Sequence, residues 1–172
     1  MSAVIIDGKA LGRSIEDGLS ERVAALRERG VTPNLAVVIA GEDPASQVYV
    51  RNKQRACERC GILSTRIDLS STATQDDILE IVVDLNADDS VHGILVQSPA
   101  PEGVDELAVA GAIDPAKDVD GFHPSNLGKL VQGVGDGLLP CTPAGVLRML
   151  EESGVALSGS KAVVIGRSRI VG

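Results

Sequence analysis

Apolar residues recur along the first hundred positions of the chain with two alternating periods. A period of three to four residues from Leu11 to Leu26 predicts an amphipathic helix that ends at Gly30. Short apolar runs rich in β-branched residues predict three buried strands, at residues 34–40, 62–69 and 93–97. Because helical segments separate these strands, we expect an α/β fold: a parallel, three-layer α/β domain whose sheet is covered by helices on both faces.

Two further helices are predicted between the strands, and each begins near a residue that can cap its N-terminus. The first covers residues 43–60, where Ser46 is the expected cap. The second covers residues 74–86 and begins at Thr74, with Asp77 three residues on.

The pattern changes in the last third of the chain. Residues 114–140 are rich in Gly, Pro and Asp, and only a short helix is predicted there, at 125–131. A helix at 143–153 and a buried strand at 161–165 follow.

The predicted last strand runs directly into a glycine-bearing turn. A strand followed by such a turn opens a dinucleotide-binding βαβ unit, although a single strand cannot form a domain. We therefore expect a complete α/β domain over residues 1–140. Residues 141–172 are expected to hold a linker helix and then the first strand and turn of a truncated Rossmann-type domain.

Composition narrows the possible functions. The 172 residues include 16 Lys and Arg against 24 Asp and Glu, a net charge of −8, which argues against a nucleic-acid partner because phosphate binding needs clustered cations. No apolar run is long enough to span a membrane, and the N-terminus lacks the pattern of a secretory signal. We expect a cytoplasmic protein without a membrane partner.

The clearest candidate for chemistry is a Tyr and a Lys one helical turn apart. Tyr49 and Lys53 share a helix face, and Lys53 is expected to point back toward the carboxyl end of the sheet. Gln97 ends a neighbouring strand at that same edge, where ligands bind in open α/β sheets. A partly desolvated Lys can have a pKa low enough for proton transfer. The alternative is a surface Lys beside a Tyr that packs on its own helix.

A second candidate is the segment that contains Asp118, Asp120 and Phe122. A carboxylate held in a rigid turn beside a ring can accept hydrogen bonds from an aminopyrimidine-type heterocycle. An Asx-turn or a cation site are the alternatives.

Cysteine and histidine point to no metal site. Cys57 and Cys60 lie near a helix end without a second pair, so buried small side chains are the favoured interpretation. His92 and His123 are isolated in the sequence.

A third candidate is the turn at the end of the chain. Gly166 directly after a predicted strand allows backbone N–H groups to approach a phosphate, and Arg167 can meet a ribose phosphate. As a motif it is weak, because it is not G-x-G-x-x-G.

These segments together resemble one family, the bifunctional methylenetetrahydrofolate dehydrogenase/methenyltetrahydrofolate cyclohydrolases. The matching stretches run in family order, at Ile5–Leu11, Val37–Lys53, His92–Pro101, Asp114–Pro124, Pro140–Leu150 and Val163–Gly172. Short-chain dehydrogenases also use a Tyr-x-x-x-Lys pair, but their glycines precede the Tyr, whereas here the glycine turn follows it.

The resemblance implies NADP-dependent oxidation of methylenetetrahydrofolate to the methenyl form and its hydrolysis to formyltetrahydrofolate, in one-carbon metabolism. By this resemblance, Lys53 handles the proton, Tyr49 stacks on or orients the folate, and Gln97 holds Lys53. The remaining residues that the resemblance implies are Asp120, Val96 and Ser98 for the pterin, and Gly166, Arg167 and Ser168 for NADP. No metal is implied, and a homodimer is expected.

The chain departs from the family pattern at several positions. Ser98 and Ala100 stand where the family usually has leucines, and Arg169 replaces an Asn in the glycine turn. The family's later substrate-contacting stretch is absent from these 172 residues. The alternative function is therefore a non-catalytic folate-domain remnant that binds pterin weakly or mediates assembly.

Overall fold

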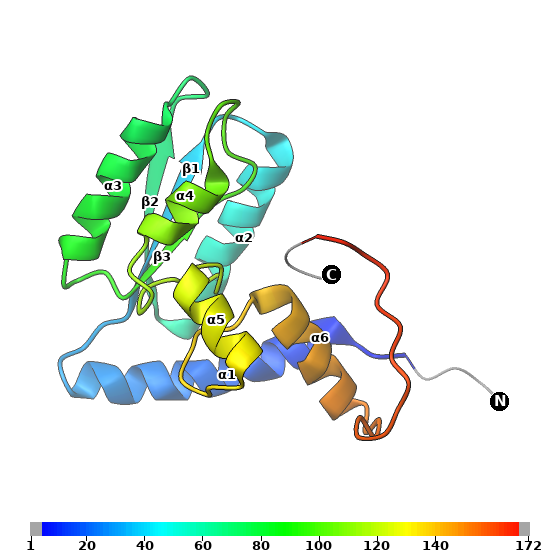
Figure 1. The fold of residues 1–172 in the computed structure, drawn as a ribbon. Coiled ribbons are helices and arrows are strands. Elements are labelled where there is room, and N and C mark those ends of the chain that lie inside the picture. Colours follow the sequence, from blue (N-terminus) through cyan, green and yellow to red (C-terminus); the bar gives the residue numbers. More distant parts are fainter. Residues whose placement is uncertain (1–4, 169–172) are drawn as a thin grey trace.

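The computed structural model of the chain describes residues 5–168 (Figure 1). Its strands are β1 (Asn34–Ala40), β2 (Leu63–Leu69) and β3 (Gly93–Val96). Its helices are α1 (Gly8–Glu28), α2 (Pro44–Cys60), α3 (Gln75–Ala87), α4 (Glu106–Ala112), α5 (Pro124–Gln132) and α6 (Cys141–Glu152). The elements predicted over the first hundred residues are confirmed, with boundaries that differ by one or two residues at most of the ends.

The three strands form one parallel sheet in the order β2-β1-β3. In the register, Val38 of the central strand lies between Ile67 of β2 and Val96 of β3. The two crossovers therefore bring the carboxyl ends of all three strands to one edge of the sheet.

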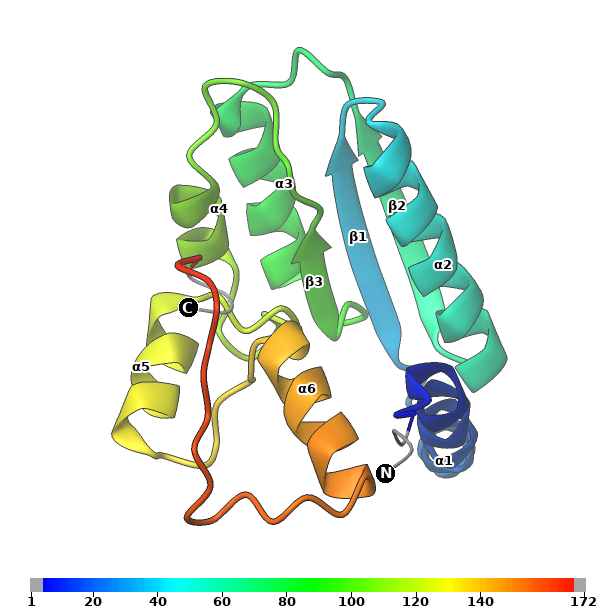
Figure 2. The ribbon, with the colours of Figure 1, turned by 90° about the vertical axis from the view of Figure 1, so that its right-hand side faces the viewer.

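Helices cover both faces of the sheet, as Figure 2 shows, with α3 and α4 on one side and α2 on the other. Side chains of β1 alternate between two apolar clusters because successive residues of a strand face opposite sides. Ala36 and Val38 pack in a cluster with residues of α3, and Val37 and Ile39 pack with Val50 of α2. The predicted three-layer α/β domain is confirmed.

One helix cap differs from the prediction. Asp43, rather than Ser46, is the N-cap of α2: its carboxylate accepts the backbone N–H of Ser46 at 2.7 Å. Ser46 is itself buried inside the helix, and its hydroxyl donates to the carbonyl of Ser98. The predicted start of α3 is confirmed, since Thr74 and Asp77 form a reciprocal capping box.

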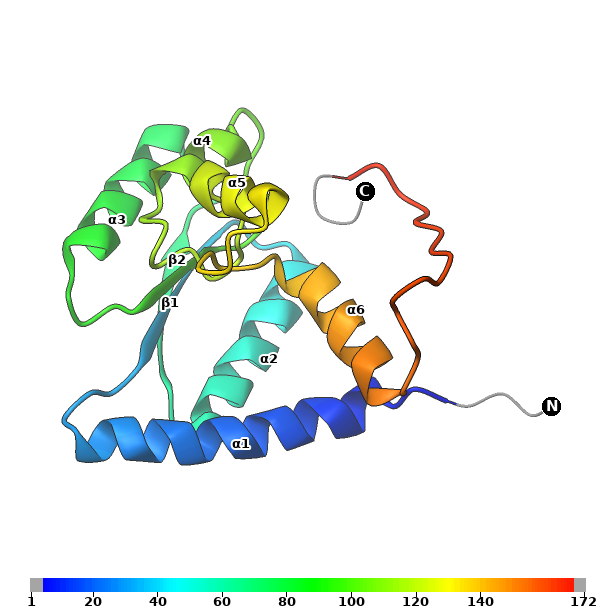
Figure 3. The ribbon, with the colours of Figure 1, turned by 60° about the horizontal axis from the view of Figure 1, so that its bottom comes forward.

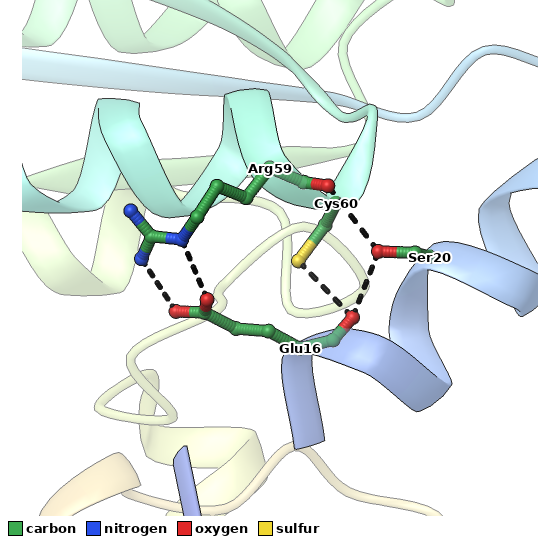
Figure 4. A network of polar contacts seen from close by, with 4 residues as sticks. All are labelled: Glu16, Ser20, Arg59 and Cys60. Carbon is green, nitrogen blue, oxygen red and sulfur yellow. Dashed lines mark hydrogen bonds and ion pairs between the residues drawn. The ribbon is translucent and has the colours of Figure 1, made fainter. Parts of the chain in front are cut away.

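The long helix α1 lies across the end of α2 (Figure 3). Figure 4 shows the contacts at this junction, where Glu16 makes a two-point ion pair with Arg59 and the Ser20 hydroxyl donates to the Arg59 carbonyl. Cys57 and Cys60 are buried, as the sequence predicts, and both are free cysteines.

Helix α4 was not expected from the sequence. It has only 7 residues, which is too short for an apolar period to be recognised, and its N-terminus is capped by Asp105. It packs on α3 through buried Val109 and Ile113, which extend the apolar cluster on that face.

The predicted strand at residues 161–165 is wrong for this structure. The segment has no regular secondary structure, and Val163 and Ile165 are 86% and 93% exposed. A strand needs hydrogen bonds to a neighbouring strand, and none is paired with it among residues 5–168. Figures 1 and 3 show the segment beyond α6, apart from the sheet.

Two further expectations concern the end of the chain, and the described residues test neither. The departure at Arg169 lies outside the described residues. The division into two domains near residue 140 stays a prediction.

None of the helices within residues 5–168 is both long and apolar enough to cross a membrane.

Candidate functional site

The predicted Lys and Gln lie in direct contact. The Nζ of Lys53, on α2, donates to the Oε1 of Gln97 at 3.3 Å. The backbone N–H of Gln97 bonds to the Val38 carbonyl at 2.8 Å, which continues the pairing of β3 with β1 and places Gln97 at the carboxyl edge of the sheet. Its Nε2 donates to the Ser98 carbonyl at 2.7 Å, so the carboxamide oxygen is left to face the ammonium.

Tyr49 lies one turn before Lys53 on the same face of α2. Its side chain is exposed, with 62% of the residue accessible, and it takes part in no hydrogen bond with any of residues 5–168. An exposed ring at this place is available to a ligand.

A cavity of about 530 Å³ opens beside Gln97, a size that suits a small organic ligand. Its wall includes four of the residues expected to contact the folate: Val96, Gln97, Ser98 and Asp120. Phe122 and Ala100 also line it, whereas Tyr49 and Lys53 do not. Lys53 contacts this wall through its hydrogen bond to Gln97.

The carboxyl of Asp120 is partly buried in this cavity. Burial raises the pKa of Asp120, the Lys53 ammonium opposes that rise, and the Asp118 carboxylate adds to it. Asp120 and Lys53 are thus close enough to interact, although residues 49–53 and 118–122 belong to distant parts of the chain.

The turn that carries Asp120 is held tightly against the next segment. Gly121 has φ +70°, and a Cβ placed there would lie 2.5 Å from the carbonyl carbon of Leu139. Glycine is therefore required both by the backbone conformation and by the close approach. The alternative of a cation site has no support among the described residues, where no group of three His, Cys, Asp or Glu side chains is arranged to hold a metal.

Two further residues at this site were missed from the sequence. Asn126, on α5, is 2% exposed and bonds to the Asp118 carboxylate. Cys141, the first residue of α6, donates from its thiol to the Val119 carbonyl. Nearby protein atoms desolvate this thiol and raise its pKa, and the Asp120 carboxylate raises it further. Neither residue carries a local motif, so their roles appear only when the chain is folded.

The turn expected to bind NADP lies in the exposed segment after α6. Arg167 and Ser168 line the same cavity as Asp120, while Gly166 does not. A guanidinium group and backbone N–H groups suit a phosphate chemically. The strand and helix that would present them as a dinucleotide-binding turn are not formed within the described residues.

The fold and the cavity define an α/β protein with a cavity at the carboxyl edge of a parallel sheet, the place where ligands bind in this class of fold. The family model "Tetrahydrofolate dehydrogenase/cyclohydrolase, catalytic domain" matches residues 6–120, and the corresponding "NAD(P)-binding domain" matches residues 140–172. The chain belongs to the tetrahydrofolate dehydrogenase/cyclohydrolase family, so the resemblance identified in the sequence is confirmed.

Similar proteins support this assignment. The "Bifunctional protein FolD" of Halalkalibacterium halodurans is 52% identical over 172 residues, which cover 100% of this chain and 61% of that protein. The protein of the same name from an Azoarcus species is 55% identical over 172 residues, 59% of its length.

Solved structures agree in fold. The bifunctional enzyme FolD from Campylobacter jejuni matches with a TM-score of 0.97 at 46% identity, over 99% of this chain and 61% of that one. The Trypanosoma brucei enzyme, complexed with NADP cofactor and inhibitor, matches with a TM-score of 0.95 at 38% identity, over 100% of this chain and 59% of that one. The chain thus spans about three fifths of the length of these relatives.

Proposed function

We propose that this chain supplies the folate site of an NADP-dependent methylenetetrahydrofolate dehydrogenase and methenyltetrahydrofolate cyclohydrolase. The observation that carries the proposal is the contact of Lys53 with Gln97, at the sheet edge where the cavity with Asp120 opens. The names of the similar proteins support the same two activities.

The two reactions need different help from the protein. In the first, 5,10-methylenetetrahydrofolate loses a hydride and becomes the methenyl cation, which requires alignment of the two reactants. In the second, water adds to that cation, loses a proton, and the ring opens to 10-formyltetrahydrofolate. A base is needed only for the second reaction.

Lys53 is the group we assign to proton transfer. Gln97 accepts a hydrogen bond from its Nζ and so restricts the direction in which the ammonium or amine points. Asp120 lies within electrostatic range of the Lys53 ammonium. Tyr49, whose ring is exposed one turn earlier, is assigned to stack against the folate.

Asp120 is assigned to the pterin. An ionised carboxylate accepts the N–H donors of an aminopyrimidine ring, and the partly buried position strengthens such bonds. Val96 and Ser98 form the adjoining wall of the cavity. The small side chains of Ser98 and Ala100 leave this wall more open than the leucines of the family pattern would, and the Ser98 hydroxyl makes it more polar.

NADP, when bound, accepts the hydride. Gly166, Arg167 and Ser168 are the residues of this chain assigned to it, because a guanidinium group suits the additional phosphate that distinguishes NADP from NAD. They provide part of a nucleotide site, and the similar Trypanosoma brucei structure contains NADP.

The test is a substitution of the proton-transfer residue. Lys53→Met in the protein expressed from its full reading frame should abolish ring opening of methenyltetrahydrofolate, followed by its absorbance. The matched control is Lys161→Met, which removes an exposed Lys outside the site. A wild-type rate in Lys53→Met would remove Lys53 from the mechanism.

A non-catalytic folate-domain remnant is the second candidate. It is favoured by Val163 and Ile165, which are exposed and lie in no strand of the described structure. An assay of NADP reduction with methylenetetrahydrofolate separates the candidates, since a remnant binds folate but reduces no NADP.

A homodimer in the cytoplasm is the further expectation from the family resemblance. Sedimentation equilibrium tests the dimer, and fractionation of the source cells tests the location. A monomer at micromolar concentration would contradict the first expectation.

A further inference from the structure

A second carboxylate lies two residues before Asp120 and is more deeply buried. Asp118 is 1% exposed and lies at the wall of the same cavity. Its Oδ2 accepts the backbone N–H of His123 at 2.8 Å and the side-chain N–H of Asn126 at 2.9 Å. Both donors belong to the start of α5, so hydrogen bonds tie this carboxylate to that helix.

The residue just before Asp118 is fixed to the core. The Nζ of Lys117 donates to three carbonyl oxygens at the end of α3, at 2.8 to 3.0 Å, and thereby uses all three of its donors. The carbonyl of Lys117 accepts the N–H of Ile94, in β3, at 2.7 Å. The segment that leads into the site is therefore attached to a helix and to the sheet.

Asn126 ties the same segment to α5 at a second point. Its buried amide donates to the Pro115 carbonyl at 2.9 Å as well as to Asp118. One side chain thus holds two positions of the loop that precede Asp120. None of these groups is needed by the folate assignments above, and all of them hold the segment just before Asp120.

We propose that Asp118 is a positioning residue for the folate site: anchored by α5, it places Asp120 in the cavity and sets the charge of Asp120 through its own charge. The inference rests on the proposed function only insofar as Asp120 is the group that contacts the folate. The electrostatic coupling between the Asp118 and Asp120 carboxylates does not depend on any ligand.

The charged groups around Asp120 determine the sign of this effect. Asp120 faces the Lys53 ammonium from α2, the Cys141 thiol from α6 and Asp118 from its own loop. A fixed negative charge close by makes ionisation of Asp120 less favourable. Binding of N–H donors requires the carboxylate, so folate affinity should rise with pH as Asp120 ionises, and removal of the Asp118 charge should move that rise to lower pH.

The experiment compares Asp118→Asn with Asp114→Asn. Asn keeps the shape of the side chain and an oxygen for the two donors, while the negative charge is lost. Asp114 lies in the same loop but is exposed, and among residues 5–168 its carboxylate accepts only the nearby N–H of Ala116, so the control makes the same change in net charge. The Asp120 carboxyl is followed by carbon-13 NMR as the pH is varied, without ligand.

We expect the titration midpoint of Asp120 to move to lower pH in Asp118→Asn and to stay in place in Asp114→Asn. An unchanged midpoint in Asp118→Asn, or an equal movement in both variants, overturns the proposal. Because Asp118→Asn is a buried substitution, the unaltered protein provides a second measurement. There, the titration midpoint of Asp120 should lie above the ordinary carboxyl value, and an ordinary midpoint would overturn the proposal.

Calorimetric titration with 5-formyltetrahydrofolate, a stable reduced folate, connects the coupling to function. The pH at which affinity rises should move to lower pH in Asp118→Asn, in parallel with the Asp120 titration. If the unaltered protein binds no folate at any pH, the proposed function fails, while the ligand-free NMR titration still decides whether Asp118 controls Asp120.

Discussion

The same four residues, Ala-Val-Val-Ile, occur twice in this chain and adopt two different structures. At 36–39 they form the middle of the central strand β1 and are between 0% and 1% exposed. At 162–165 they lie in a segment without regular structure, in which Val163, Val164 and Ile165 are 86%, 63% and 93% exposed. The difference shows that β propensity is not sufficient: a strand forms where neighbouring strands and helices supply hydrogen bonds and cover.

The strongest test of this comparison places a charge in each copy. Val38→Asp buries an unpaired carboxylate in the central strand and should cost more than about 4 kcal/mol of the free energy of unfolding, enough to unfold most of the protein. Val164→Asp, the equivalent position of the second copy, should change it by less than about 0.5 kcal/mol. Urea denaturation followed by circular dichroism measures both, and equal losses would show that the two copies are packed alike.

A second test asks whether the turn at the site belongs to the packed region. Gly121 and Gly133 both have φ +70°, but a Cβ at Gly121 would meet the Leu139 backbone while one at Gly133 would meet nothing within 4 Å. Alanine at either position should cost about 1–2 kcal/mol for its left-handed conformation. Gly121→Ala should cost about 1–3 kcal/mol more because of the close contact. Similar losses in thermal unfolding would mean that the turn can move away from Leu139.

The smallest expected effect is a pH dependence of stability. Its sign should be opposite for a partly buried carboxylate, Asp120, and for an exposed carboxylate that caps a helix, Asp77. Burial raises the pKa of Asp120, so its contribution to stability is present below the ordinary carboxyl pKa and is lost as the pH rises through the raised value. Asp120→Asn should therefore gain stability relative to the unaltered protein as the pH increases toward neutrality. The measurement is the melting temperature across a pH series.

Asp77 provides the matched comparison. The backbone N–H and hydroxyl of Thr74 lower the pKa of Asp77, so its contribution is present above the ordinary carboxyl pKa and is lost as the pH falls through the lowered value. Asp77→Asn should be less stable near neutrality, with a difference that shrinks in acid. The same pH trend in both variants would contradict the assigned environments.

Much of the fold could be predicted because its signals are local. The bounds of β1 and the capping pair Thr74 and Asp77 follow from residues only a few positions apart. The prediction of Ser46 as the cap is wrong because Asp43 and Ser46 are both good capping residues, and only the path of the backbone decides between them. The short helix α4 has too few residues to show a period.

The candidate site could be predicted in part for the same reason. The spacing of Tyr49 and Lys53 and the place of Gln97 at a strand end are local features, and the contact between Lys53 and Gln97 agrees with them. The burial of Asp118, its bond to Asn126 and the closeness of Cys141 to Asp120 depend on how α5 and α6 return to the sheet. No spacing within the sequence encodes that return directly.

The sequence by itself determined the alternation of strands and helices, the helix starts and the ordered motifs that identify the family, because each depends on the backbone preferences and side-chain period of a short segment. Only the tertiary structure decided which Ala-Val-Val-Ile segment is buried, which side chains share the cavity and which carboxylate loses its water. Burial and electrostatic coupling are properties of distances between remote parts of the chain, and those distances exist only after the layers have packed.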